Sequence, residues 1–83
     1  MLDKNKLKVI YEKYGFEEHS TTEKNIVIFS IRTGHYHNAD IIPLSPNVDI
    51  TETIYEYQQL GFACQTKTYS SIDEVEFALF SGF

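Results

Sequence analysis

The fold is decided by the stretch Asn25-Ile26-Val27-Ile28-Phe29-Ser30-Ile31-Arg32. Its β-branched and aromatic residues are the types that are enriched in strands. Apolar side chains occupy both alternating faces of the stretch, whereas a strand with one solvated face would alternate apolar with polar residues. We therefore predict a central strand that is covered by other elements on both faces.

Upstream of this strand, apolar residues recur at the spacing of an amphipathic helix, and we predict a helix over residues 3–14. Asp3 is the predicted N-cap, and Gly15 is the residue that ends the helix. Residues 16–20 follow as a short strand. The apolar face of the helix consists of Leu7, Ile10, Tyr11 and Tyr14.

Downstream, residues 33–38 read as a loop, and residues 39–44 as a third strand with Pro43 near its end, because proline cannot donate to a ladder. The residues 49–52 match a capping box and open a second helix, which Gly61 ends. Residues 62–68 form a fourth strand. A second capping box at 71–74 opens a third helix that runs through Phe80. The apolar face of the second helix is predicted as Ile50, Ile54, Tyr57 and Leu60.

The predicted order of elements is therefore α-β-β-β-α-β-α. Short links make the first three strands a meander of antiparallel hairpins. The helix-containing link between the third and fourth strands is long enough for a right-handed parallel crossover. We expect an α/β (α+β) fold with a four-stranded mixed sheet and helices packed on it.

The length of 83 residues allows one domain, residues 1–83. A single cysteine, Cys64, cannot form an internal disulfide, which favours a reducing compartment. There is no signal-peptide pattern, and no apolar run approaches the ~20 residues of a membrane span. These features predict a cytoplasmic protein that does not associate with membranes.

Charge is distributed unevenly along the chain. Residues 1–48 carry six basic and six acidic side chains, whereas residues 49–83 carry one basic and six acidic ones. The acidic second half accounts for the net charge of −5. Because acidic surfaces repel phosphate backbones, nucleic acid is not an expected partner. A solvated surface is the simple interpretation of the charges themselves.

The C-terminal stretch Ala78-Leu79-Phe80-Ser81-Gly82-Phe83 is apolar, whereas chain ends usually taper into polar residues. We interpret it as a boundary within a longer bacterial protein, of which this would be the N-terminal part. In the third helix, Phe77 and Phe80 point away from the apolar line that faces the sheet. We predict that Phe77, Phe80 and Phe83 form an exposed patch that binds the rest of the chain or another protein. Self-association through this helix is a further possibility, and a wrap over the sheet edge is the alternative.

One local cluster offers metal-ligand chemistry, namely His35, His37 and Asp40, and His19 is a further residue that could lie nearby. Two histidines at i, i+2 can project from one side of an extended segment, and with a carboxylate they would make three ligands. No second group of ligands occurs elsewhere in the chain, so we expect a polar loop and no metal or other cofactor.

The other reactive candidate is Cys64, which would need a neighbouring cation to become a nucleophile. Its neighbours Phe62 and Ala63 indicate a core strand instead, so we predict a buried and inert thiol. The four glycines are scattered and form no phosphate-binding loop.

The order of elements resembles the core of restriction-endonuclease-like nucleases. That resemblance implies an acid near the second strand and an acid-x-lysine motif on the third, which together hold Mg²⁺ and orient the attacking water. Asp40 matches the acid of the third strand, but Ile42 stands where the lysine belongs. Residues 25–32 contain no partner acid. The resemblance therefore implies a non-catalytic relative.

A second resemblance covers about a quarter of the chain. His37-Asn38-Ala39-Asp40-Ile41-Ile42 and Glu76-Phe77-Ala78-Leu79-Phe80-Ser81-Gly82-Phe83 are similar to the N-terminal domain of large bacterial signalling NTPases of the STAND class. This implies an accessory domain joined to a nucleotide-dependent machine. We expect a non-enzymatic interaction or regulatory domain. The alternative is a divergent metal-dependent nuclease-like domain that uses Asp40 with His35 and His37.

Overall fold

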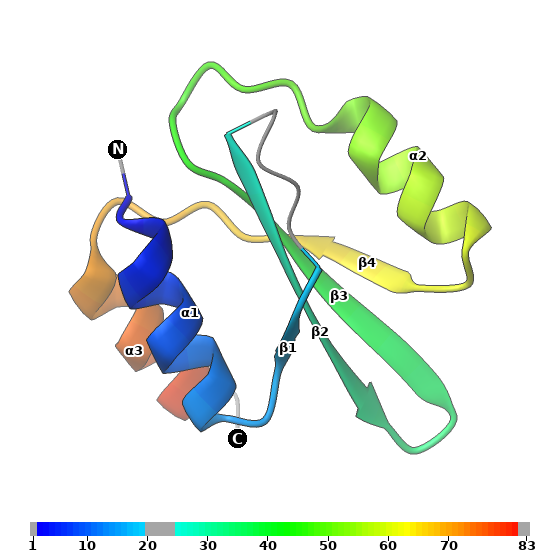
Figure 1. Ribbon diagram of the computed structural model, residues 1–83, viewed down its shortest axis with the longest axis horizontal. Helices are drawn as coiled ribbons and strands as arrows, with labels where there is room; N and C mark the ends of the chain where they lie inside the picture. The colour runs from blue at the N-terminus through cyan, green and yellow to red at the C-terminus, as the bar shows by residue number, and fades with distance from the viewer. Residues whose placement is uncertain (1, 20–24, 82–83) are drawn as a thin grey trace.

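The computed structural model describes residues 2–19 and 25–81 and confirms the predicted order of elements (Figure 1). Three helices and a four-stranded mixed sheet make an α+β fold. In chain order the elements are α1 (Lys4–Lys13), β1 (Glu17–Glu18), β2 (Ile26–Thr33), β3 (Tyr36–Pro43), α2 (Thr51–Gln59), β4 (Ala63–Thr66) and α3 (Ile72–Ser81).

The strands lie side by side in the order β1-β2-β3-β4. The β1–β2 and β2–β3 pairs are antiparallel, and the β3–β4 pair is parallel. β2 lies inside the sheet, and its first five residues are all buried, as the apolar character of both its faces predicts. Pro43 is the last residue of β3, so its missing N–H removes no bond from the middle of the ladder.

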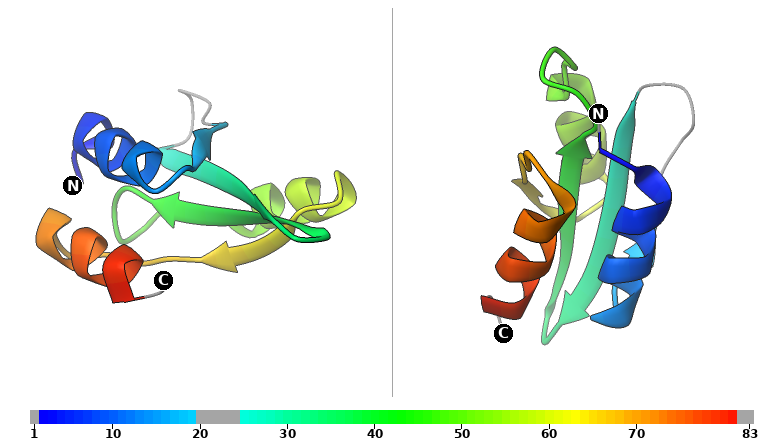
Figure 2. Two further views of the ribbon diagram at one scale, coloured as in Figure 1. Left: turned by 90° about the horizontal axis from the view of Figure 1, so that it is seen from below. Right: turned by 90° about the vertical axis from the view of Figure 1, so that its left-hand side faces the viewer.

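The helices cover both faces of the sheet (Figure 2). α1 and α3 lie next to each other on one face, and α2 lies on the opposite face. The α1/α3 face holds a cluster of nine buried residues, which includes Tyr11, Phe29 and Ile42. The α2 face holds a smaller cluster of four, namely Ile26, Ile28, Ala39 and Ile41.

Helix ends follow the local sequence. Asp3 caps α1, because its Oδ1 accepts hydrogen bonds from the backbone N–H of Asn5 at 2.9 Å and of Lys6 at 3.3 Å. Gly15 and Gly61 follow α1 and α2 with φ values of +92° and +97°, the left-handed conformation that glycine adopts without a steric cost.

The β2–β3 connection differs from the expected loop over residues 33–38. Pairing continues to Thr33 and Tyr36, which leaves a two-residue turn at Gly34 and His35, with Gly34 at φ +62°. His37 and Asn38 therefore belong to β3. The polar composition of residues 33–38 favoured a loop. These residues nevertheless pair as strands, because cross-strand hydrogen bonds hold a hairpin together even where it has no apolar face.

Helix α2 keeps most of its predicted face, because Ile50, Ile54 and Tyr57 pack against the buried cluster on its side of the sheet, but Leu60 and the cap differ. Leu60 is 71% exposed, and Thr53 is the buried residue of the helix. Ile50 takes the N-cap position without a side-chain bond, while Asp49 accepts from the N–H of Thr51 at 2.9 Å. Local periodicity therefore predicted the helix and most of its apolar face, but not the exposure of Leu60 at its C-terminal end.

The N-terminal cap of α3 resembles the predicted capping box, but one of its two hydrogen bonds involves a different residue. Ser71 Oγ accepts a hydrogen bond from the N–H of Glu74 at 3.3 Å. Glu74 in turn accepts from the N–H of Ser70 at 3.0 Å, one residue earlier than the box motif requires. Within the described ranges, no helix combines the length and the apolar character that crossing a bilayer requires.

Candidate functional site

Asp40, the acid of the expected nuclease motif, is held inside the α1/α3 face. It lies on β3 with 7% of its surface exposed. Its Oδ2 accepts a hydrogen bond from the hydroxyl of Tyr11 in α1 at 3.0 Å. The Tyr11 hydroxyl also lies 2.8 Å from that of Tyr69, in the segment before α3. This Tyr11–Asp40–Tyr69 network therefore joins a helix, a central strand and the segment that leads into α3.

Burial dominates the electrostatics of this network. It raises the pKa of Asp40, although the hydrogen bond from Tyr11 and the charge of Lys67 act in the opposite direction. It also raises the pKa of Tyr11 far above its ordinary range, with added contributions from Tyr69 and Asp40. Tyr11 therefore stays a hydrogen-bond donor at any physiological pH, and it stacks on Phe29 with ring centroids 4.3 Å apart.

The remaining positions of a nuclease centre hold apolar side chains. The residue opposite Asp40 on β2 is Phe29, which is fully buried. The lysine position holds Ile42, which is also fully buried and lies opposite Val27. A nuclease centre needs a second carboxylate to hold Mg²⁺ and a lysine to orient the attacking water at neighbouring positions of these strands. Phe29 and Ile42 instead belong to the buried core at these positions.

A small cleft of about 180 Å³ opens beside Asp40. Its polar lining comes from β3 and from β4 and the segment after it, and includes Gln65 and Lys67. Gln65 is the residue opposite Asp40 in the parallel β3–β4 pair. The residues of β2 and β3 do not reveal this neighbourhood in the sequence, because β4 comes next to β3 only through the crossover. Lys67 is the one basic residue of residues 49–83, and this isolated charge was the feature of the sequence that could have pointed to a site near β4.

The structure does not bring His35, His37 and Asp40 together. His35 lies in the hairpin turn. His37 faces the α2 side, where its ring lies 4.3 Å from that of Phe62. Asp40, three residues later, faces the α1/α3 side, because neighbouring strand residues point to opposite faces. Within residues 2–19 and 25–81, no three His, Cys, Asp or Glu side chains are placed to hold a metal ion.

A third histidine, His19, joins His37 on the α2 face. Its Nε2 lies 2.6 Å from Ser30 Oγ, and its ring centroid is 6.5 Å from that of His37. Both imidazoles contact Phe62, which also lies against Tyr57. Aromatic packing accounts for these histidines, and His19 does lie near His37, although not near Asp40 on the other face.

Cys64 is half-buried on the α2 face, next to Phe62 and Ile54, and so is more accessible than the predicted core thiol. Its Sγ lies 3.9 Å from the carbonyl oxygen of Ile54. Burial raises the pKa of this thiol. Since the thiolate is the reactive form, this environment disfavours nucleophilic chemistry.

Two of the predicted partner-binding residues are among the most exposed apolar side chains of the described chain. Phe77 and Phe80 on α3 are 72% and 73% exposed, while Val75 and Leu79 of the same helix are buried. Phe83 lies outside the described residues. Between α1 and α3 is a shallow groove of about 360 Å³, which is lined by Val9, Ile10 and Ile72 with Asn5, Lys6 and Glu76. Val9 itself is 69% exposed.

Comparison with known proteins agrees with this geometry. Residues 6–83 match the family described as NACHT-associated inactive Restriction Endonuclease 2. No curated protein and no solved structure matches the chain. The match covers most of the sequence, and it accords with the nuclease-like order of elements and with the apolar residues that replace the catalytic set. The chain belongs to the family of NACHT-associated inactive restriction-endonuclease-like domains.

Proposed function

We propose that this domain is a non-enzymatic interaction module whose contact surface is formed by α3 together with the neighbouring side of α1. The exposure of Phe77 and Phe80 carries this proposal. Large apolar side chains that are exposed on one side of a helix, while its other side packs on the sheet, are typical of surfaces that become buried in an assembly. Aromatic residues also supply much of the binding energy at protein interfaces.

The proposed partner is a NACHT-containing segment of the same polypeptide. The family description associates these domains with NACHT proteins. A contact within one polypeptide needs less intrinsic affinity than one between separate chains, because the link raises the effective concentration of the partner. A modest patch around Phe77, Phe80 and Val9 is therefore sufficient for such a contact.

The test is the double variant Phe77→Ser/Phe80→Ser, compared with Tyr55→Ser/Leu60→Ser. Tyr55 and Leu60 are 63% and 71% exposed on α2, so the control removes similar apolar surface from the opposite face of the sheet. Isothermal titration calorimetry would measure the affinity of the 83-residue chain for the NACHT segment. We expect the α3 variant to bind at least ~10-fold more weakly, since losing two aromatic contacts costs more than about 1.4 kcal/mol. The control should bind like the unmodified chain.

Thermal unfolding of both variants separates binding from stability. Because Phe77 and Phe80 are exposed, both variants should unfold near the temperature of the unmodified chain. A loss of about 3–5 kcal/mol in the α3 variant would show that these phenylalanines belong to the core. Equal affinities for the two variants would overturn the proposed contact surface.

A further inference from the structure

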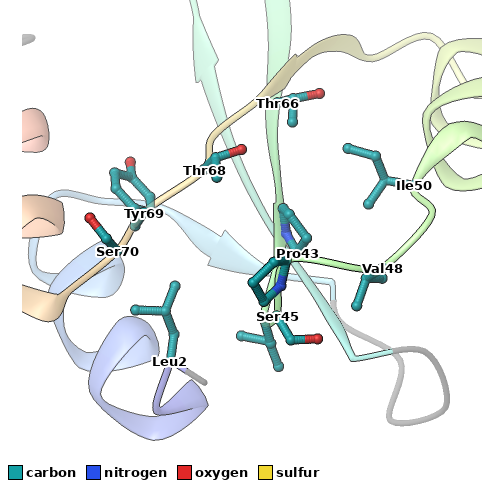
Figure 3. A pocket seen from close by; sticks show the side chains of 11 residues that line it. Leu2, Pro43, Ser45, Val48, Ile50, Thr66, Thr68, Tyr69 and Ser70 are labelled. Atoms are coloured by element: carbon teal, nitrogen blue, oxygen red, sulfur yellow. The ribbon is translucent and has the colours of Figure 1, made fainter.

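A larger cavity lies at the carboxyl ends of β3 and β4, away from Asp40 and from the exposed phenylalanines. Its volume is about 570 Å³, within the range of roughly 300–1,000 Å³ that is usual for small-molecule sites. Figure 3 shows Pro43 at its centre, Leu2, Tyr69 and Ser70 on one side, and Val48 and Ile50 on the other. We call this cavity the strand-end crevice.

The chain path explains why the crevice exists. After Pro43 the chain leaves β3 toward α2 on one face, and after β4 it continues to α3 on the opposite face (Figures 1 and 2). The last bond between the two segments runs from the N–H of Lys67 to the carbonyl of Ile41, at 3.1 Å. Beyond it the segments diverge and leave an opening. In open α/β sheets, ligands bind at such points, where neighbouring parallel strands connect to opposite faces.

The lining of the crevice combines apolar side chains with uncharged hydroxyl groups. Among the described residues that line it, none has a charged side chain. Leu2, Val48 and Ile50 supply apolar walls. Ser45, Thr66 and Thr68 supply hydroxyls that make no side-chain hydrogen bond to the rest of the described chain, whereas the Tyr69 hydroxyl already pairs with Tyr11. Three hydroxyls therefore remain available to a ligand.

We infer that the strand-end crevice binds an uncharged, ring-containing small molecule of nucleoside size. The ring contacts the apolar side chains that line the crevice, among them Leu2, Val48 and Ile50. Its hydroxyl or amide groups exchange hydrogen bonds with Ser45, Thr66 and Thr68. A charged ligand is disfavoured, because the crevice would remove its hydration without supplying an opposite charge. The inference is independent of the α3 contact surface.

Nuclear magnetic resonance titration of the ¹⁵N-labelled chain tests the inference, with adenosine and thymidine as uncharged probes. Their 5′-monophosphates serve as matched charged probes. We expect saturable shifts of the amides of residues 43–50 and 66–70, with a Kd of about 1 mM or tighter for at least one nucleoside. The corresponding monophosphate should bind at least ~10-fold more weakly, which corresponds to about 1.4 kcal/mol.

A variant that fills the crevice provides the second arm. Thr68→Phe places a ring inside it, and Thr66→Phe repeats the test from β4 in case the first variant folds poorly. Thr33→Phe is the matched control at the hairpin, at the opposite end of the sheet. Nucleoside shifts should disappear in a folded crevice variant and persist in Thr33→Phe. The inference is overturned by the absence of saturable shifts with either nucleoside, by tighter binding of the monophosphates, or by undiminished binding to a folded crevice variant.

Discussion

The two faces of the sheet are packed very differently. On the α1/α3 face, nine buried residues surround the stacked rings of Tyr11 and Phe29. On the α2 face, four residues are buried, and the helix itself contributes one buried side chain, that of Thr53. Since buried apolar area is the main source of stability, the α1/α3 face should carry most of the folding free energy.

The comparison also places the positions of the nuclease motif on one face of the sheet. The motif positions around Asp40 point into the better-packed face, where Phe29 and Ile42 now contribute to the core. Asp40 remains there as the acceptor for Tyr11. A position that would hold a metal-binding carboxylate in an active enzyme thus serves to attach α1 to β3.

The largest expected effect comes from truncating one aromatic ring on each face. Phe29→Ala removes a fully buried ring and should cost about 3–5 kcal/mol of unfolding free energy. Phe62→Ala removes a half-buried ring from the α2 face and should cost about 1 kcal/mol, the centre of the range for point substitutions. Urea denaturation measures both. Equal losses would show that the two faces contribute alike to stability.

A smaller effect is expected from Asp40→Asn, and it depends on pH. Because burial raises the pKa of Asp40 above its unfolded value, the favourable contribution of this group is fully present below the unfolded pKa. That contribution is lost as pH rises through the folded pKa. Asparagine stays neutral and can still accept from Tyr11, so the variant should gain stability relative to the unmodified chain as pH rises above the ordinary pKa of an aspartate.

Asp49→Asn is the matched control for that titration. Hydrogen bonds from Thr51 lower the pKa of Asp49, so its contribution is present above the unfolded pKa and lost as pH falls through the folded one. Above the ordinary pKa of an aspartate, the stability difference between Asp49→Asn and the unmodified chain should therefore stay nearly constant in urea denaturation, whereas that of Asp40→Asn should change with pH. Parallel curves for Asp40→Asn and the unmodified chain would contradict the assigned role. So would a Mg²⁺-dependent cleavage activity that Asp40→Asn abolishes.

The smallest effect concerns the thiol under α2. Cys64 is half-buried and its pKa is raised, so a thiol reagent should label it several-fold more slowly in the native chain than in denaturant. The control moves the cysteine to the neighbouring exposed position, in the variant Ala63→Cys/Cys64→Ala. That thiol should label at similar rates in both states. If native Cys64 labels as fast as this control, α2 does not shield it.

Local sequence patterns predicted most of the elements. The two-sided apolar stretch at 25–32 identified the central strand, and Asp3 and Gly15 marked the ends of α1. These features depend on neighbours along the chain. The predicted length of the hairpin loop and the predicted burial of Leu60 were both wrong for the same reason. Each depends on contacts with other parts of the chain rather than on the sequence of the segment itself.

The candidate sites were predicted to different extents. The exposure of Phe77 and Phe80 followed from helical spacing, because Val75 and Leu79 had to face the sheet. Their role in partner binding stays a prediction. The Tyr11–Asp40–Tyr69 network was not predicted, because its members are distant in the sequence. Tyr11 and Asp40 are separated by 29 positions, and Tyr11 and Tyr69 by 58. The strand-end crevice was likewise unpredictable from residues that are scattered from Leu2 to Ser70.

The sequence by itself determined the order of elements and the absence of the acid-x-lysine motif. It also determined that the third helix carries more apolar side chains than one buried face can hold. Periodicity, capping residues and residue identity are local properties that can be read without coordinates. Only the tertiary structure decided that His37 and Asp40 face opposite sides of the sheet, that Tyr11 binds Asp40, and that β3 and β4 diverge around a crevice. Strand register and the side of the sheet taken by each helix determine these contacts, and both arise from packing between segments that are distant in the sequence.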